Sequence, residues 1–224
     1  MKNYAIILAS GSGSRFMGDK PKQFVQIGGK TIFEHSIEIF EQNERIDSII
    51  IVVLEEYINF AQDIVAKNGY KKVMGLFAGG KTRQESSSIG VNSVPDEEAN
   101  VLIHDCARPF LSQQVLNKCI DALKTHTAVN VAIPATDTIM QVENGFVKNV
   151  PDRNSLMCSQ TPQCFRLSVI KKAHKMSGNF TDDCGLVLEN NLADIFVVEG
   201  EQNNIKITYP SDVYIGNMIF CNNF

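Results

Sequence analysis

Residues 8–23 combine glycines and cations in a way that suits phosphate binding. They read LASGSGSRFMGDKPKQ, so Gly11 and Gly13 directly follow an apolar run, and Arg15 and Lys22 come after them. Small residues after a strand let backbone N–H groups approach an anion closely. Two cations on one loop would stabilise a departing pyrophosphate as it gains charge. We therefore predict a triphosphate-binding loop, against the alternative of a solvated polar turn with incidental charges.

Two well-known nucleotide-binding loops do not fit this segment. A dinucleotide fingerprint needs a third glycine where this chain has Phe16. A P-loop needs a Gly-Lys-Ser/Thr triplet at a fixed offset, and the segment has none. The predicted phosphate loop is therefore of another type.

The turn around Gly79 and Gly80 is a second candidate. It follows a possible strand and leads through Lys81 to Ser86 in the run GGKTRQES. Backbone amides and a hydroxyl at this point could contact the edge of a nucleobase. The alternative is a helix entry that needs glycine and a serine cap.

The run IHDCARPF places a carboxylate at the end of an apolar strand. Asp105 could bind a metal ion or a sugar hydroxyl, or it could form a structural pair with Arg108. His104 could act as a general base, although a histidine at a strand end is more often a hydrogen-bonded packing residue. Cys106 has no evident activating base, so we expect it to be small and buried.

Other candidate groups lie far along the chain. Arg153 and Lys206 are cations, and Thr138, Thr161 and Thr181 carry hydroxyls able to bind a polyol or its phosphate. Each also has a simpler interpretation. Lys206 could point outward from a strand, and the three threonines could be a strand residue, a turn residue and a helix cap, respectively.

Alternating strand and helix patterns must position these groups. Buried strands are predicted at 4–9, 48–53, 101–104 and 129–133, with another at 72–77. Helices are predicted from a capping box at Thr31–Glu34 onward, and at 57–67, 83–92 and 111–124. This alternation predicts an α/β fold with a mainly parallel sheet and right-handed crossovers. Ligands of such sheets bind beyond the carboxyl ends of the strands.

The alternation breaks near residue 138. Segments 138–143 and 146–150 flank Asn144-Gly145, a strong hairpin signal. A lone hairpin is marginally stable, so we expect it to pack on something, such as another subunit. Helices are then predicted at 167–176 and from about 181, strands at 195–198 and 205–208, and a last helix from Pro210. We expect one domain over residues 1–224 with a dimerisation arm at about 138–150.

Composition excludes several classes of protein. The 224 residues carry 21 Lys and Arg against 25 Asp and Glu, a net charge of −4. We therefore expect no nucleic-acid partner, and any phosphate must be met by local cations. The six cysteines form no CxxC pair, which favours a reduced, cytoplasmic protein. No apolar run approaches the roughly 18 residues of a membrane span, so we expect no membrane association.

Together these motifs resemble the cytidylyltransferases that act on small polyol phosphates, with 2-C-methyl-D-erythritol 4-phosphate or ribitol 5-phosphate as substrate. The matching runs extend nearly end to end: ILASGSGSRF, PKQF, GGKTRQES, IHDCARPF, PATDTI, PDRNSL, QTPQCF, FTDDCG and VEGEQNNIKITYPSD. The resemblance implies a Rossmann-like nucleotidyltransferase sandwich, with a protruding β-hairpin arm that embraces a second subunit of a homodimer.

The resemblance also implies roles for individual residues. Arg15, Lys22, Arg153 and Lys206 would be catalytic. The nucleotide would be bound by Ala9, Ser10, Gly11, Gly13, Gly80, Ser86, Asp105 and Arg108. The polyol phosphate would be bound by Asp105, Thr138, Arg153, Thr161, Thr181 and Lys206. Mg²⁺ would be held by Asp105 or by the phosphates of CTP. Lys81 departs from the acidic or small residue expected after the glycine pair.

The implied reaction is an in-line attack of the substrate phosphate on the α-phosphorus of CTP, with release of pyrophosphate. The run FTDDCGLV, with a cysteine after Thr-Asp-Asp, resembles the ribitol-phosphate branch of the family more than the erythritol branch, which more often has a small Ala-Ser pair there. This resemblance favours D-ribitol 5-phosphate as substrate, and Thr181, Asp182 and Asp183 would supply hydrogen-bonding groups to a more hydroxylated polyol. The alternative substrate is 2-C-methyl-D-erythritol 4-phosphate. From another class, a Rossmann-type reductase or a catalytically silent relative remains an alternative.

Overall fold

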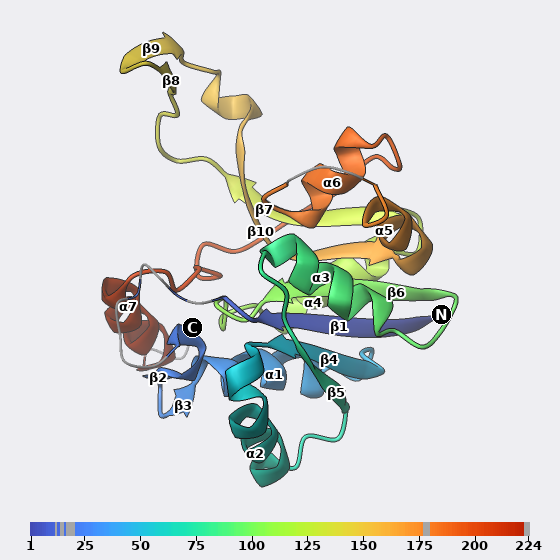
Figure 1. The fold of residues 1–224 in the computed structure, drawn as a ribbon. Helices are drawn as coiled ribbons and strands as arrows, with labels where there is room; N and C mark the ends of the chain where they lie inside the picture. Colours follow the sequence, from blue (N-terminus) through green and yellow to red (C-terminus); the bar gives the residue numbers. More distant parts are fainter. Residues whose placement is uncertain (12, 14–15, 17–20, 177–179, 222–224) are drawn as a thin grey trace.

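A seven-stranded sheet forms the centre of the molecule in the computed structural model, which describes residues 1–11, 13, 16, 21–176 and 180–221. The strand order is β11-β7-β10-β6-β1-β4-β5, and only β10 runs antiparallel to its neighbours. The strands are β1 (Lys2–Ala9), β4 (Ser48–Val53), β5 (Val73–Ala78), β6 (Ala99–Asp105), β7 (Ala128–Pro134), β10 (Met157–Arg166) and β11 (Phe196–Glu199). Figure 1 shows them between two layers of helices.

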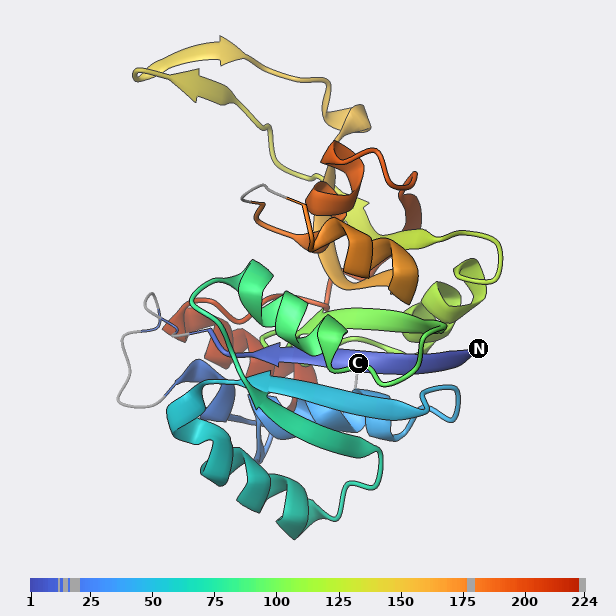
Figure 2. The same cartoon turned by 45° about the vertical axis from the view of Figure 1, so that its right-hand side comes forward.

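Apolar side chains fill both spaces between the sheet and its helices, as expected for strands buried on both faces. One layer packs around Phe33 and Phe40, and the other around Phe165. The first layer contains α1 (Ile32–Glu41), α2 (Ile58–Asn68), α4 (Gln113–Ala122) and α7 (Pro210–Cys221). The second contains α3 (Arg83–Asn92), α5 (Leu167–Ala173) and α6 (Asp183–Glu189). Figure 2 shows the layers from another side.

The sequence-based expectations of an α/β fold and of its parallel strands are confirmed. The capping box is also present: Thr31 Oγ1 accepts from the amide of Glu34 at 3.1 Å, and Glu34 accepts from the amide of Thr31 at 2.8 Å. Two short strands, β2 (Gln26–Ile27) and β3 (Lys30–Thr31), precede this helix.

Strand β10 was not anticipated. Its run QTPQCF contains Pro162, which suggested a turn because proline cannot donate to a ladder. The pairing of β10 with β7 shifts register between Ser159 and Gln163, so Pro162 lies in an irregularity where no ladder bond is required. The antiparallel β10 fills the space between β6 and β7.

The predicted strand at 205–208 is wrong. Among the described residues, this segment joins no sheet. Ile207 is nevertheless buried, and its amide donates to the carbonyl of Ala107 at 2.8 Å. This backbone hydrogen bond to the loop after β6, together with side-chain bonds from Lys22 to the carbonyl of Ile207 and from Lys206 to Asp105, holds the segment in place of a strand ladder.

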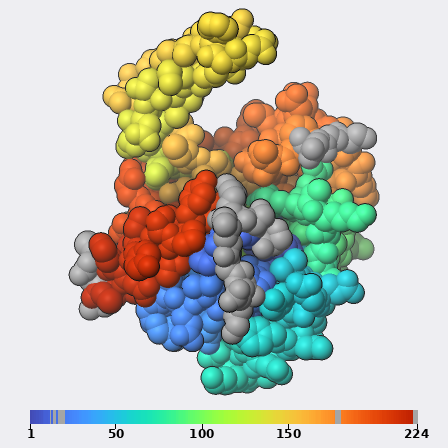
Figure 3. All heavy atoms as spheres, turned by 60° about the vertical axis from the view of Figure 1, so that its left-hand side comes forward, coloured from blue at the N-terminus to red at the C-terminus, as the bar shows by residue number. Residues whose placement is uncertain are grey.

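The expected hairpin is confirmed as β8 (Gln141–Glu143) and β9 (Phe146–Asn149), a sheet of its own joined by Asn144 and Gly145 with positive φ angles. Every residue of both strands is exposed. In the space-filling view the hairpin stands clear of the body (Figure 3). No helix in the described parts of the chain is long and apolar enough to cross a bilayer.

Candidate active site

A cavity of about 520 Å³ opens beyond the carboxyl ends of β1 and β6, the place expected for a ligand of such a sheet. Its described lining comes from the glycine loop, from residues 80–86, from the loop after β6 and from the segment around 206–208. Nine residues predicted from the sequence line it: Ala9, Ser10, Gly11, Gly13, Lys22, Gly80, Ser86, Asp105 and Lys206. Arg15 lies outside the described residues.

Ser86 connects the glycine loop to the start of α3. Its hydroxyl accepts from Ser10 Oγ at 2.8 Å and from the amide of Gly80 at 3.1 Å, and it donates to the carbonyl of Thr82 at 3.0 Å. A Cβ on Gly79 would lie 2.3 Å from Cβ of Ser10, so this approach requires glycine. The helix cap is Thr82, not a serine as the alternative interpretation supposed.

The far end of the glycine loop is tied down by Lys22 and Gln23. Lys22 Nζ donates to the carbonyl of Ile207 at 2.8 Å, which fixes the lysine against the segment that carries Lys206. Gln23 is buried, and its Nε2 donates to the carbonyl of Ala9 at 2.7 Å. Gln23 was not anticipated as a site residue, since a glutamine after a Pro-Lys pair gives no local signal.

Asp105 pairs with two cations, and neither is Arg108. Its Oδ2 accepts from Lys206 Nζ at 2.5 Å and its Oδ1 from Arg83 Nε at 3.1 Å. Burial raises the pKa of the Asp105 carboxyl, but the charges of Arg83 and Lys206 outweigh burial and hold that pKa well below its usual range. The carboxylate is therefore ionised at neutral pH.

Asp105 is a poor candidate for a metal ligand in this arrangement. Both of its oxygens accept hydrogen bonds from cations, which compete with a metal ion for the same lone pairs. In the described part of the chain, no three His, Cys, Asp or Glu side chains cluster as a metal site. The described side chains therefore do not form a site that fits a metal ion, and we expect the phosphates of a nucleotide to bind Mg²⁺.

His104, Thr161 and Arg108 form a supporting group outside the cavity lining. His104 Nε2 lies 3.0 Å from the carbonyl of Arg108, and its Nδ1 lies 3.0 Å from Thr161 Oγ1. Burial lowers the pKa of His104 to about 4, so the ring is neutral, with its proton on Nε2 facing the carbonyl. Thr161 Oγ1 also accepts from the amide of Asp105 at 3.1 Å. The packing interpretation of His104 is therefore correct.

Arg108 and Thr161, to which the resemblance gives roles in ligand binding, are not among the residues that line the cavity. Arg108 donates to the carbonyls of Asn204 and Ser159 at 2.8 and 3.2 Å. It therefore ties the segment carrying Lys206 to strand β10. The hydroxyl of Thr161 is engaged by the backbone of Asp105, as described above.

Thr138, Arg153 and Thr181 are exposed and do not line the cavity of their own chain. Arg153 lies in a 3₁₀ turn (Arg153–Ser155) at the base of the arm and donates to the carbonyl of Thr136 at 3.1 Å.

Cys106 lines the cavity but is unsuited to nucleophilic chemistry. Burial raises the pKa of its thiol to about 12, so the thiolate is rare at neutral pH. This agrees with the expectation that Cys106 is small and buried.

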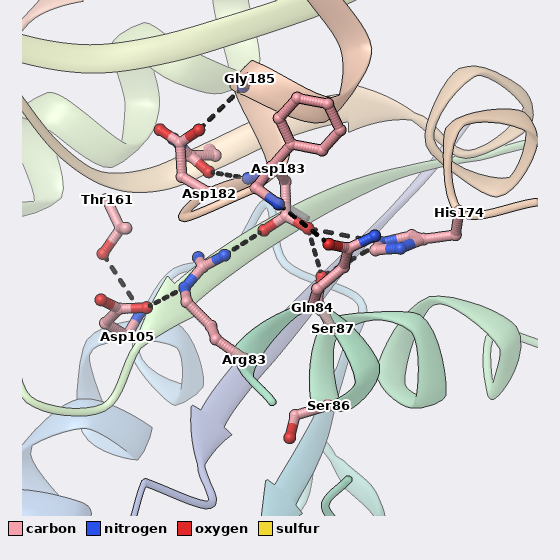
Figure 4. A network of polar contacts seen from close by, with 12 residues as sticks. Arg83, Gln84, Ser86, Ser87, Asp105, Thr161, His174, Asp182, Asp183 and Gly185 are labelled. Carbon is pink, nitrogen blue, oxygen red and sulfur yellow. Dashed lines mark hydrogen bonds and ion pairs between the residues drawn. The ribbon is translucent and has the colours of Figure 1, made fainter. Parts of the chain in front are cut away.

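A polar network that sequence reasoning missed lies beside the cavity (Figure 4). Arg83 bridges Asp105 and Asp183, with Nη1 donating to Asp183 Oδ2 at 2.7 Å. Asp183 was expected to face a polyol, but its side chain is only 1% exposed and accepts from Ser87 Oγ at 2.6 Å. Asp182 caps α6 and accepts from Gln163. Asp183 therefore offers no group to a polyol in the cavity, and this part of the argument for ribitol phosphate is wrong.

A glycine-loop cavity lined by lysines at the ends of parallel strands defines a nucleotidyltransferase. Residues 4–222 match the family of 2-C-methyl-D-erythritol 4-phosphate cytidylyltransferase, IspD. The chain belongs to this family and is a cytidylyltransferase.

Relatives with two different names are similar to the chain. A 2-C-methyl-D-erythritol 4-phosphate cytidylyltransferase of Thermosipho melanesiensis is 42% identical over 219 residues, covering 95% of each protein. The bifunctional ribulose 5-phosphate reductase/CDP-ribitol pyrophosphorylase Bcs1 of Haemophilus influenzae is 40% identical over 98% of this chain, which spans 48% of that protein. The crystal structure of 4-diphosphocytidyl-2C-methyl-D-erythritol synthase from Anaerococcus prevotii superposes with a TM-score of 0.86 and 30% identity, covering 98% of both chains.

Proposed function

We propose that this chain transfers the cytidylyl group of CTP to 2-C-methyl-D-erythritol 4-phosphate and releases pyrophosphate. The observation that carries the proposal is the match to that family over residues 4–222, together with a cavity whose glycine loop and lysines suit a triphosphate. A phosphate monoester is already ionised at neutral pH, so the reaction needs no strong general base. This agrees with a neutral, buried His104 and a protonated Cys106 beside the cavity.

In this proposal each side of the cavity has its own task. Amides of the glycine loop, with Lys22 and Arg15, bind the triphosphate and stabilise the charge that develops on pyrophosphate. Gly80 and Ser86 form the wall for the cytosine. Lys206 orients the acceptor phosphate for in-line attack, held by Asp105. Mg²⁺ enters with CTP, bound to its phosphates.

A second acceptor, D-ribitol 5-phosphate, is favoured by one observation. The Haemophilus influenzae protein, named for CDP-ribitol, is 40% identical along 98% of this chain, close to the 42% of the relative from Thermosipho melanesiensis. The exposed Thr181 remains a candidate contact to either polyol.

We also propose that the enzyme is a homodimer whose arm completes the partner's site. The arm carries exposed apolar side chains, among them Met140, Val142 and Phe146 at 55, 58 and 76% exposure. An isolated hairpin with such a surface is marginally stable in water, and burial against a second copy would stabilise it. Thr138 and Arg153 would then reach the polyol phosphate bound by the other subunit.

Pyrophosphate release tests the proposed function. The purified protein is incubated with CTP, MgCl₂ and each polyol phosphate in turn, and kcat/KM is compared. We expect turnover with 2-C-methyl-D-erythritol 4-phosphate at a kcat/KM at least tenfold above that with D-ribitol 5-phosphate. The reverse preference would assign the ribitol reaction, and no turnover with either would refute both acceptors.

A further inference from the structure

Arg83 is shared between two carboxylates that belong to different parts of the fold. Its Nε donates to Asp105 at the end of β6, and its Nη1 donates to Asp183 at the start of α6. The three side chains are 25, 12 and 1% exposed, respectively. Asp105 in turn accepts from Lys206. Figure 4 shows the part of this chain that joins Asp183, Arg83 and Asp105. With the bond to Lys206, charged contacts run without a break from the buried Asp183 to the ammonium group in the cavity.

Asp183 is held by three further groups. It accepts from Ser87 Oγ of α3 at 2.6 Å, and its backbone amide donates to Gln163 Oε1 of β10 at 2.9 Å. His174, after α5, places Nε2 3.3 Å from Asp183 Oδ1. Asp183 does not line the cavity, so no ligand there can contact it. Any effect of Asp183 on the reaction must pass through Arg83 or through a shift of α3 or α6.

Lys206 needs an external constraint. It lies on a segment that joins no sheet, and its side chain is 39% exposed. A lysine on a four-carbon stem has many rotamers, and a fixed carboxylate selects among them. Asp105 is that carboxylate, and Arg83 holds its other oxygen.

We propose that Arg83, anchored by Asp183, is a positioning residue that fixes Asp105 and thereby places the Lys206 ammonium at the acceptor end of the cavity. The proposal rests on the proposed function for the role of Lys206. Arginine suits the task because its planar guanidinium presents N–H groups in two directions, whereas a lysine is a point charge. Two cations and two carboxylates also compensate one another, so the network is not an unpaired buried charge.

Asp183→Asn is the sharpest variant, because it removes the anchor's charge while changing no group that lines the cavity. We expect kcat/KM for the acceptor to fall at least tenfold, while the Kd of CTP changes less than threefold. Asp121→Asn is the matched control, since Asp121 pairs with Arg45 and Lys124 at an exposed site away from the cavity and should leave both constants unchanged. Thermal unfolding checks that each variant is folded.

A double-mutant cycle separates positioning from general destabilisation. In a Lys206→Met background, Asp183→Asn should lower the acceptor kcat/KM by less than twofold, because the lysine it positions is gone. If Asp183→Asn does not fold, Arg83→Lys replaces it in the same double-mutant cycle with Lys206→Met. If the double variant instead loses kcat/KM by the full product of the two single-variant factors, the two residues act independently and the proposal is overturned.

A measurement without substrate keeps this proposal separate from the proposed function. Lysine acetylation by acetic anhydride, followed by mass spectrometry, reports how tightly each amine is held. With exposed Lys30 as internal reference, Lys206 should react at least threefold faster in Asp183→Asn than in wild type. An unchanged rate would overturn the positioning role. If the wild type shows this protection but turns over neither polyol phosphate, only the proposed function fails.

Discussion

Lys22→Met tests whether the end of the glycine loop stabilises the leaving pyrophosphate. Lys22 lines the cavity, and its Nζ donates to the carbonyl of Ile207. Removing one charge-stabilising donor from a transition state lowers kcat by about 10²–10³, or about 2.7–4 kcal/mol. The lost hydrogen bond to Ile207 costs folding about 1.5–3 kcal/mol. For a chain of this size that corresponds to roughly 3–12 °C in Tm, so the variant should remain folded at 25 °C.

The assay is pyrophosphate release at saturating CTP and acceptor, where kcat is measured directly. Lys30→Met is the control, because Lys30 is an exposed lysine nearby in sequence that pairs with Glu38 at 2.7 Å and does not line the cavity. It should keep kcat within twofold of wild type. If folded Lys22→Met keeps kcat within threefold of wild type, Lys22 does not stabilise the leaving group, and the assignment of the phosphate site is wrong.

Three further predictions concern assembly, pH and packing. Replacing residues 142–148 by a short turn should give a monomer with reduced activity, and light scattering of the intact protein would refute the dimer by giving a monomer mass at micromolar concentration. The pKa of buried His104 is about 4 in the folded protein and about 6.5 in the unfolded chain. As the pH falls, the unfolded state therefore binds the proton first, and the free energy of unfolding should drop by about 3 kcal/mol between pH 6.5 and 4. Urea unfolding measures this fall, which His104→Gln should flatten. Gly90→Ala should cost about 1–3 kcal/mol in the same assay, because its Cβ would lie 2.4 Å from Cγ2 of Ile6.

Much of the sheet could be predicted because its strands are continuous apolar runs. The parallel strands and the capped α1 are specified by adjacent residues, so local pattern is enough. Strand β10 could not be found in this way. Its central Pro162 contradicts a ladder position, and only the register shift opposite β7 makes it compatible. In the same way, Ile205 and Ile207 suggest a strand, although a backbone bond to Ala107 and side-chain bonds to and from the segment replace the ladder.

The site was predictable where the chemistry is local in the sequence. The glycine loop, Lys22 and Asp105 stand beside strand ends, so their place at the edge of the sheet follows from topology. Arg83 and Asp183 are 100 residues apart, and nothing in either segment indicates the pair. Asp183 was therefore assigned to the polyol substrate, where the resemblance to the family places it. Its burial depends on how α6 packs against α3 and α5.

Local charge resolves the apparent conflict between an acidic protein and an anionic substrate. The chain has a net charge of −4, yet the described lining of the cavity holds four cationic side chains and the single carboxylate of Asp105. Two of the cations, Arg83 and Lys206, pair with that carboxylate. The pairing orients their side chains, but it also cancels part of their positive potential in the cavity. Lys22 and Lys81 stand in the same lining and add their charges to it. The positive charge that attracts a triphosphate therefore comes from the side chains of the cavity lining and not from the net charge of the protein. Because the Debye length is about 8 Å at 0.15 M salt, the acidic remainder of the surface is screened from it.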